Sequence, residues 1–249
     1  MSNRIREEFI QKKEPVRLNK YLSEAGVCSR READRLIESG KVTVDGETAL
    51  MGMRVIPGQV VRVGRKVVSR QDEMVVLAVN KPRGIVCTEE RREKNNIIRF
   101  LNYPIRVTYA GRLDKDSRGL LLMTNNGDII NQMMRASNCH EKEYKVTVDR
   151  EVTDEFLKHM AEGVPILDTV TRPCRVSRIG KYTFSIILTQ GLNRQIRRMC
   201  EAFGYEVRDL LRVRVMNIRL GSLPEGEYRE LTDRELEELS VLLQDTPRN

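Results

Sequence analysis

The sequence contains little of what several common classes of protein require. It has no tryptophan, only two histidines, and five cysteines that are far apart and form no C-x-x-C pair. An odd number of scattered cysteines indicates neither a disulfide framework nor a zinc site, and two histidines are too few to favour a metal centre. We therefore expect no bound metal and a reducing, cytoplasmic environment.

Long hydrophobic runs are also missing. The longest apolar runs, such as residues 74–79, are far shorter than the roughly 20 residues that a membrane-spanning helix requires. The N-terminal stretch MSNRIREEFIQKKEP has no apolar segment and mixes acidic with basic residues, which fits neither a secretory signal nor a transit peptide. We expect a soluble protein with no membrane partner, in which residues 1–15 form a flexible arm.

The sequence does have an excess of positive charge. Lys and Arg outnumber Asp and Glu by 44 to 36, which gives a net charge of +8 and a pI near 9.4. Such a surface attracts polyanions by Coulomb interaction and by counterion release. A chain of 249 residues with 40% hydrophobic residues can hold a small module and a domain of ordinary size. The composition therefore predicts two domains and a nucleic-acid partner.

Residues 16–64 show the pattern of a compact unit made of two helices and a small sheet. An apolar helical stripe over 18–25 predicts the first helix, and a capping-box sequence at 29–32 predicts the second. Alternating apolar residues around the hairpin dipeptide Asp45-Gly46 predict the strands. The expected order is helix, helix, small sheet.

Basic residues crowd the two helices and the turn into the sheet: Arg17, Lys20, Arg30, Arg31, Arg35 and Lys41. This placement would present one positive face to phosphates, although a solvated helix surface explains any single one of them. The run RLNKYLSEAGVCSRREADRLIESGKVTVDG resembles the S4 RNA-binding domain, a small module found in many RNA enzymes. The resemblance implies that this unit binds structured RNA, through backbone charge and shape because it has no aromatic platform.

A second domain is predicted over residues 74–249, after a polar linker at 65–73. Strands are expected at 74–79, 106–110, 120–124, 144–148 and 182–189, and helices at 128–135, 153–161, 194–203 and 232–243. The last of these helices opens with a capping box. Because helices do not alternate one for one with strands, we predict an α+β domain with a mainly antiparallel central sheet.

The polar loop GRLDKDSRG at 111–119 falls between two of the predicted strands and holds two carboxylates among three bases. A nearby positive charge favours the ionised carboxylate, so Asp114 is a candidate nucleophile or base. An aspartate that bonds its own turn is the ordinary alternative. A calcium loop is excluded because Arg118 and Asn125 stand where an EF-hand has an oxygen donor and a bidentate glutamate.

The run GRLDKDSRGLLLMTNNGD resembles the catalytic signature of the pseudouridine synthases that carry an S4 domain. NKPRGIV, KEY at 142–144 and GLNRQIRRM at 191–199 resemble further motifs of that family, in the same order. The stretch GVPILDTVTRPC and the acidic terminal helix are similar to the F-type large-subunit branch. The resemblance implies isomerisation of uridine to pseudouridine in 23S (large-subunit) ribosomal RNA, and leaves transfer RNA open as a substrate.

The resemblance also implies roles for single side chains. Asp114 is the expected nucleophile, and its attack at C1′, its attack at C6 and abstraction of a sugar proton all stay open as routes. Tyr144 is expected to stack on the target base, unless it is plain core, and Arg197 to pair with Asp114, with Arg194 as the alternative partner.

Further residues near the nucleophile are expected to contact RNA: Arg112, which would help to turn out the uridine, and Arg194 and Arg198, which would line a groove. Lys115, Asp116 and Arg118 are expected to shape the loop or to contact phosphate. Because the isomerisation involves no net redox change, the resemblance implies no cofactor.

A non-catalytic RNA-binding factor for ribosome assembly is the alternative, because positive charge and the S4-like unit alone support it. The intact Arg-Leu-Asp triplet at 112–114 favours the enzyme. A hydrolase or metal-dependent nuclease is disfavoured, since the sequence offers no ligand cluster. Nothing in the sequence requires a partner chain, so a monomer is expected.

Overall fold

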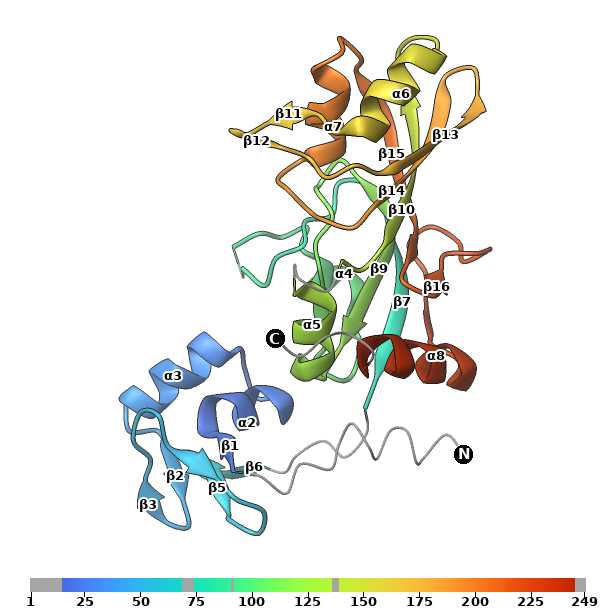
Figure 1. The fold of residues 1–249 in the computed structure, drawn as a ribbon. Helices are drawn as coiled ribbons and strands as arrows, with labels where there is room; N and C mark the ends of the chain where they lie inside the picture. The colour runs from blue at the N-terminus through green and yellow to red at the C-terminus, as the bar shows by residue number, and fades with distance from the viewer. Residues whose placement is uncertain (1–14, 69–73, 91, 136–138, 245–249) are drawn as a thin grey trace. The chain divides into compact units, whose positions relative to one another are not determined.

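The computed structural model describes residues 15–68, 74–90, 92–135 and 139–244 (Figure 1). Most of the predicted arm therefore lies outside the described residues. The chain divides into two compact units. The first is Met1–Val76 with Tyr103–Thr108 and Thr124–Gly127, and the second is Leu77–Asn102 with Tyr109–Met123 and Asp128–Asn249.

The N-terminal part of the first unit has the predicted order of helix, helix and small sheet. Its elements are β1 (Val16–Arg17), α2 (Leu18–Glu24), α3 (Arg30–Glu38), β2 (Val42–Val44), β3 (Glu47–Thr48), β4 (Arg54–Val55), β5 (Val61–Val63) and β6 (Lys66–Val68). Four strands form a sheet in the order β3-β2-β5-β6, and β1 pairs with β4. This part of the prediction is confirmed.

Local chemistry sets the ends of these helices. Ser29 Oγ accepts a hydrogen bond from the Glu32 amide at 3.3 Å, so the serine half of the predicted capping box begins α3. Gly26 and Gly40 follow the two helices with φ of 77° and 68°, a conformation that glycine adopts without strain. The apolar faces of both helices and of the sheet share one core, which includes Leu18, Leu22, Ala33, Ile37, Val42 and Val61.

The small sheet extends further than the sequence predicts. β6 (Lys66–Val68) pairs with β5 in antiparallel register, with Val61 opposite Val68. Val68 is buried in the core of this unit, a contact that the mostly polar stretch at 64–73 obscures. The prediction that the linker begins at residue 65 is therefore wrong, because residues 66–68 form a strand of the sheet. Residues 69–73 lie outside the described part of the chain.

The remainder of the chain is built on a nine-stranded sheet. Its strands are β7 (Val76–Lys81), β8 (Thr108–Ala110), β9 (Arg118–Thr124), β10 (Lys142–Val148), β13 (Arg175–Gly180), β14 (Thr183–Leu188), β15 (Val207–Val215), β16 (Ile218–Arg219) and β17 (Tyr228–Glu230). The order is β13-β14-β10-β15-β9-β7-β17, with β8 beside β9 and β16 beside β15. β15 and β9 are parallel, whereas β10 is antiparallel to both β14 and β15. The predicted α+β domain with a mainly antiparallel sheet is confirmed.

Helices and a short hairpin complete this part: α4 (Ile97–Leu101), α5 (Gly127–Met134), α6 (Asp154–Glu162), β11 (Pro165–Ile166), β12 (Thr169–Val170), α7 (Gln195–Glu201) and α8 (Asp233–Gln244). Figure 1 shows α6 and α7 near the end of the sheet where β13 and β14 lie. The capping box predicted for α8 forms, because Thr232 and Glu235 each accept a hydrogen bond from the other's amide.

The central strand β15 is absent from the prediction. Its sequence, VRDLLRVRV, places charged residues among the apolar ones and so hides the period of a buried strand. One of these charges, Arg212, is only 2% exposed. A buried guanidinium needs internal hydrogen-bond acceptors, and these lie in the candidate site.

No helix in the described ranges is long and apolar enough to cross a membrane. All five cysteines are unbridged. Among the residues that the structure describes, no group of three or more His, Cys, Asp or Glu side chains is placed to hold a metal ion.

Candidate active site

The loop that carries Asp114 joins β8 to β9. Asp114 is half-buried, and its backbone carbonyl accepts a hydrogen bond from the Ser117 amide at 3.1 Å, which turns the chain back toward the sheet. The neighbouring Leu113 is buried, and its amide donates to Cys87 Sγ at 3.5 Å. In the described part of the chain the Asp114 carboxylate makes no hydrogen bond, to its own turn or elsewhere. The ordinary alternative of a self-bonding turn aspartate is therefore wrong.

Gly119 sets the end of the loop against β15. It pairs in parallel register with Arg212 and has φ of 104°. A Cβ atom added to Gly119 would lie 2.4 Å from the Arg212 carbonyl oxygen and 2.8 Å from the Arg212 nitrogen, both backbone atoms that cannot move aside. Only glycine fits this close approach, which ties the start of β9, and with it the loop, to β15.

A buried arginine holds the loop on the C-terminal side of Asp114. Arg197 of α7 is 8% exposed, and its Nη2 donates to the Asp116 carbonyl oxygen at 3.1 Å. Its Nη1 donates to the carbonyl of Val207 at 3.1 Å. One guanidinium thus joins the loop, α7 and β15.

A second buried arginine holds the loop on the N-terminal side. Arg212 donates from Nη1 to the Arg112 carbonyl at 3.4 Å and from Nε to the Leu120 carbonyl at 2.6 Å. The carbonyls two residues before and two residues after Asp114 therefore each accept a hydrogen bond from a buried guanidinium. These contacts fix the backbone that carries the carboxylate and leave the carboxylate itself unbonded.

The predicted ion pair between Arg197 and Asp114 is wrong for the described structure. Arg197 and Arg194 both pair with Asp116 instead, at 3.4 and 3.3 Å. Burial alone would raise the pKa of Asp116, but the hydrogen bond from Arg194 and the charges of Arg197 and Arg194 outweigh it and hold that pKa below its ordinary value. Asp116 thus shapes the loop, as expected, while Asp114 two residues earlier stays unpaired.

Lys81 is a cationic neighbour of Asp114 that the sequence analysis does not single out. It ends β7, is fully buried, and donates from Nζ to the carbonyls of Pro82 and Ile85 at 2.8 Å each. Burial lowers the pKa of Lys81, against opposing effects of Cys87, Asp114 and Asp116. The NKPRG turn is the only sequence signal for it, and a hydrogen bond of 2.8 Å from Gly84 N to the Lys115 carbonyl joins that turn to the loop.

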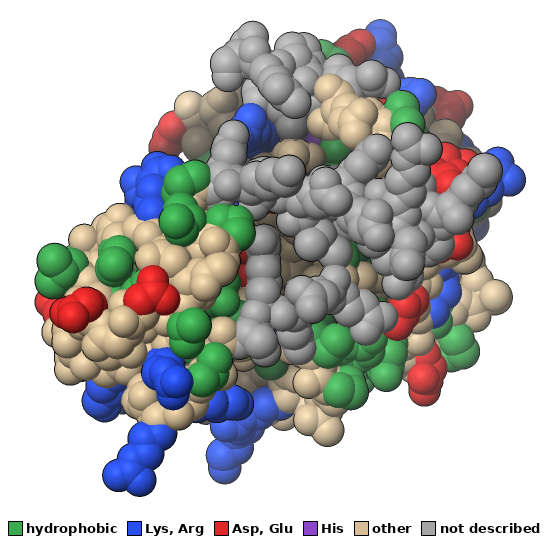
Figure 2. Space-filling view, turned by 90° about the horizontal axis from the view of Figure 1, so that it is seen from below, with side chains coloured by type: hydrophobic (Ala, Val, Ile, Leu, Met, Phe, Trp, Pro, Cys, Tyr) green, Lys and Arg blue, Asp and Glu red, His purple; other side chains and the backbone are tan. Residues whose placement is uncertain are grey.

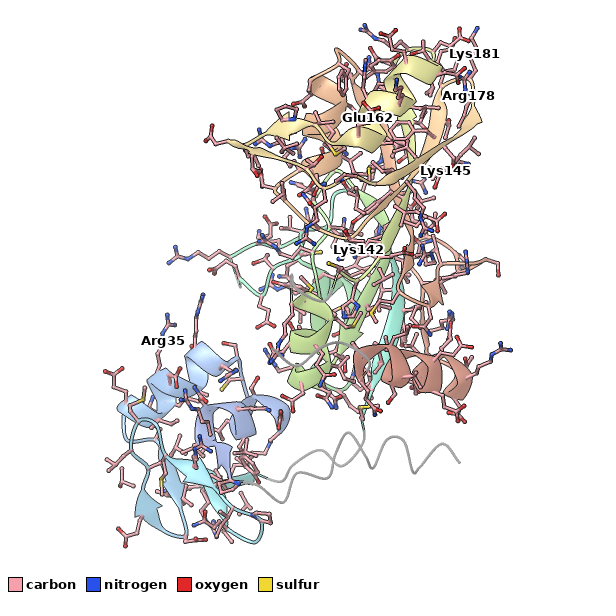
Figure 3. The ribbon with its side chains drawn as sticks, viewed as in Figure 1. Arg35, Lys142, Lys145, Glu162, Arg178 and Lys181 are labelled. Atoms are coloured by element: carbon pink, nitrogen blue, oxygen red, sulfur yellow. The ribbon has the colours of Figure 1, made fainter. Side chains whose placement is uncertain are left out.

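Tyr144 lies on β10 directly opposite Arg212 on β15. Opposed residues of an antiparallel pair place their side chains on one face of the sheet. The ring is half-buried and packs against the core of this part of the chain, so it is partly a core residue. Lys142, labelled on the same strand in Figure 3, has a pKa lowered by burial and by the charge of Arg212. Tyr144 and Lys142 therefore belong to the surroundings of Arg212.

The other arginines of this region differ in exposure. Arg112 is exposed, and Arg194 is exposed in a left-handed conformation just before α7. Arg198 donates to the backbone and side chain of Asn193 at 3.1 and 3.2 Å, so it braces the start of its own helix. RNA contact by these three residues stays a prediction.

The RNA-binding residues predicted in the first unit are mostly exposed. Arg17, Arg30, Arg31 and Lys41 are exposed, whereas Lys20 is half-buried and pairs with Glu24 at 3.5 Å. In Figure 2, where this unit lies at the left, Lys and Arg side chains gather along its lower edge. These exposed side chains give this part of the unit a positively charged surface.

Comparison with known proteins gives concordant matches. The family described as RNA pseudouridylate synthase matches residues 75–202, and the S4 domain matches residues 16–61. The "Dual-specificity RNA pseudouridine synthase RluF" of Escherichia coli O6:H1 is 54% identical over 93% of this chain and 80% of its own length. The "Ribosomal large subunit pseudouridine synthase B" of Bacillus subtilis (strain 168) is 35% identical over 91% of this chain and 96% of its own. A solved structure titled "Crystal structure of pseudouridylate synthase" is 29% identical, with a TM-score of 0.67 over 90% of this chain and 99% of that one.

Proposed function

The chain belongs to the RNA pseudouridylate synthase family and is an RNA pseudouridine synthase, and we propose that it modifies large-subunit ribosomal RNA with Asp114 as its nucleophile. The observation that supports this role most directly is the bracing of the Asp114 loop. Buried guanidinium groups hold the backbone on both sides of Asp114, while its carboxylate has no partner among the described residues. A carboxylate fixed in this way is positioned for a substrate and not for the fold.

The reaction needs no outside reactant. The C1′–N1 bond of uridine breaks, the base turns, and a bond forms between C1′ and C5, after which the C5 proton is lost and N1 gains one. Atoms and electrons balance without a cofactor or an energy source. Asp114 acts by attack at C1′, by attack at C6 or by abstraction of a sugar proton. Tyr144 stacks on the uracil, and the exposed Arg112 helps to turn the uridine out of its stack.

The proposed substrate follows from what the relatives are named for. One is described as acting on the ribosomal large subunit and another as having dual specificity. We assign 23S ribosomal RNA as the main substrate and transfer RNA as the candidate for a second one. The chain acts as a monomer in the cytoplasm, and the exposed bases of the first unit hold the RNA by its phosphates.

A tritium-release assay tests this function. Ribosomal RNA transcripts carrying tritium at uracil C5 should release tritium when the protein is added, and release should persist in a metal chelator. Tight RNA binding without release from ribosomal or transfer RNA would instead identify a non-catalytic binding factor.

A further inference from the structure

One hydrogen-bond donor of the Arg212 guanidinium is unpaired within the described structure. Its Nε and Nη1 bind the carbonyls of Leu120 and Arg112, but Nη2 is buried and has no hydrogen-bond partner among the residues that the structure describes. An unpaired, charged donor in a protein interior is unfavourable, and native proteins keep few of them. One physical reason to retain such a group is a ligand or substrate that satisfies it, and the surroundings of the group decide whether this reason applies.

The place of Arg212 identifies the substrate as the candidate partner. On one side it contacts the backbone of the Asp114 loop, and on the other it is the register partner of Tyr144. Lys81 and Lys142 both lie within range of its charge. Arg212 is therefore surrounded by the proposed nucleophile, an aromatic ring and two lysines. Such surroundings suit a base that becomes electron-rich during the reaction.

We propose that Arg212 is a catalytic residue whose Nη2 donates a hydrogen bond to a carbonyl oxygen of the target uracil. The proposal rests on the function proposed above. When the C1′–N1 bond breaks, its electron pair stays with the base and is shared by O2 and O4. The pair is returned when C5 bonds to C1′ and the C5 proton is replaced by one on N1. A fixed guanidinium donor at O2 or O4 stabilises that charge without having to reorganise.

The donor is shielded in the free protein, so the target base has to uncover it. Nη2 is closed to solvent, and the side chains that share its face of the sheet include Tyr144 and Lys142. A uridine that stacks on Tyr144 therefore has to displace the atoms that close off Nη2 before its carbonyl oxygen can accept the hydrogen bond. Where the contact is to O4, cytosine offers an amino group in place of an acceptor and leaves the donor unpaired, so the residue then also favours uridine over cytosine.

Arg197 is a matched control. It is also a buried arginine, it also donates to a carbonyl of the Asp114 loop, and its Nε also has no partner. Arg197 pairs with Asp116, however, and it lies on helix α7 and not on the strand opposite Tyr144. Loss of a loop brace should therefore be common to variants of both residues, whereas loss of a bond to uracil should be specific to Arg212.

The test is a double-mutant cycle between the enzyme and single atoms of the substrate. RNAs carrying uridine, 2-thiouridine or 4-thiouridine at the target position are converted under single-turnover conditions by the wild-type enzyme, Arg212→Lys and Arg197→Lys. A thiocarbonyl sulfur is a weak acceptor, so one of the two thio-RNAs should slow the wild-type enzyme about tenfold. Arg212→Lys should be slow with all RNAs and insensitive to that sulfur, while Arg197→Lys should keep the sensitivity of the wild type.

Equal sensitivity in Arg212→Lys and the wild type would overturn the proposal and leave Arg212 as a brace alone. So would a wild-type enzyme that converts both thio-RNAs at the normal rate, a result that needs no variant to fold. Thermal melting checks the variants, and Arg212→Gln replaces Arg212→Lys if the latter does not fold. Failure of the proposed function is distinct, because the wild-type enzyme would then convert no uridine in the unmodified RNA.

Discussion

Arginine has two different uses in the two parts of this chain. In the first unit, Arg17, Arg30 and Arg31 lie exposed on and beside the helices. Around the Asp114 loop, Arg197 and Arg212 are buried and donate to backbone carbonyls. An exposed guanidinium attracts phosphate with little demand on geometry, whereas a buried one fixes the atoms that it binds. Net charge therefore predicts the RNA partner, whereas the buried arginines fix the backbone of the Asp114 loop.

The carboxylates of the second part show the same division. Asp209 is held by Arg118 through two hydrogen bonds of 3.0 and 2.7 Å, and Asp116 by Arg194 and Arg197. Asp114 has no such partner among the described residues. The paired carboxylates of Asp209 and Asp116 therefore support the fold, whereas we propose that the Asp114 carboxylate is available to a substrate. Variants that separate binding from chemistry test this division.

The largest effect is expected at Asp114 itself. Asp114→Asn removes a charge without changing volume, so we expect the single-turnover rate to fall by about 1,000-fold or more while the RNA dissociation constant changes less than about threefold. Nucleoside analysis by mass spectrometry measures the rate, and filter binding measures the affinity. Asp116→Asn is the matched control and should lose less activity. Turnover near the normal rate in Asp114→Asn would mean that another residue is the nucleophile.

A smaller loss is expected when one brace of the loop is removed. Arg197→Met should lower kcat about 100-fold with little change in KM, because the loop loses its hydrogen bond at the Asp116 carbonyl but the RNA-binding surface is intact. Arg198→Met, on the same helix, should cost only a few-fold, since Arg198 contacts Asn193 and not the loop. Steady-state kinetics of both variants measure kcat and KM. Equal losses of kcat in the two variants would show that the integrity of α7, and not the hydrogen bond from Arg197 to the loop, sets the rate.

Exposed arginines of the first unit should affect affinity alone. The double variant Arg30→Gln/Arg31→Gln should weaken RNA binding about tenfold and lower the slope of log K against log salt by about 2, with the rate at saturating RNA unchanged. Arg234→Gln on α8 is the control, because Arg234 is equally exposed but pairs with Glu238. An unchanged salt slope in the double variant would contradict phosphate contact by these residues.

The smallest effect concerns stability. Burial alone would raise the pKa of Asp209, but hydrogen bonds from Arg118 and Arg83 outweigh it and depress that pKa below the ordinary 3.8. A depressed carboxyl pKa stabilises the fold above the ordinary value, and this contribution is lost as the pH falls through the folded-state pKa. Asp209→Asn should therefore lower the free energy of unfolding by ~1 kcal/mol at pH 7 and by less at pH 3. Urea unfolding at both pH values measures it, and a gap that widens in acid would contradict the assignment.

Local features of the fold could be predicted from the sequence, and long-range ones could not. The serine half of the box predicted at 29–32 and the complete box at 232–235 form because each depends on residues three positions apart. Strand β15 escapes prediction because the acceptors of its buried Arg212, at Leu120 and Arg112, lie 92 and 100 residues away. That the guanidinium of Arg212 can be buried becomes evident only when those distant acceptors are known.

The candidate site shows the same limit. The sequence places Asp114 in a loop between strands, and the structure agrees, but Arg197 binds this loop at Asp116 and does not form the predicted pair with Asp114. The sequence does not separate Asp114 from Asp116 as the partner of Arg197, since spacing alone cannot show which of two nearby carboxylates turns toward a helix 80 residues later. Lys81 is likewise hidden, because nothing in NKPRG shows that its ammonium group binds two carbonyls of its own turn.

The most direct test of the account is a map of pseudouridine in ribosomal RNA from cells that lack this protein, before and after they are supplied with the wild-type chain or with Asp114→Asn. We predict that at least one pseudouridine of the large-subunit RNA disappears without the protein and returns with the wild-type chain but not with Asp114→Asn. An unchanged map, or a map restored by Asp114→Asn, would contradict the proposed function.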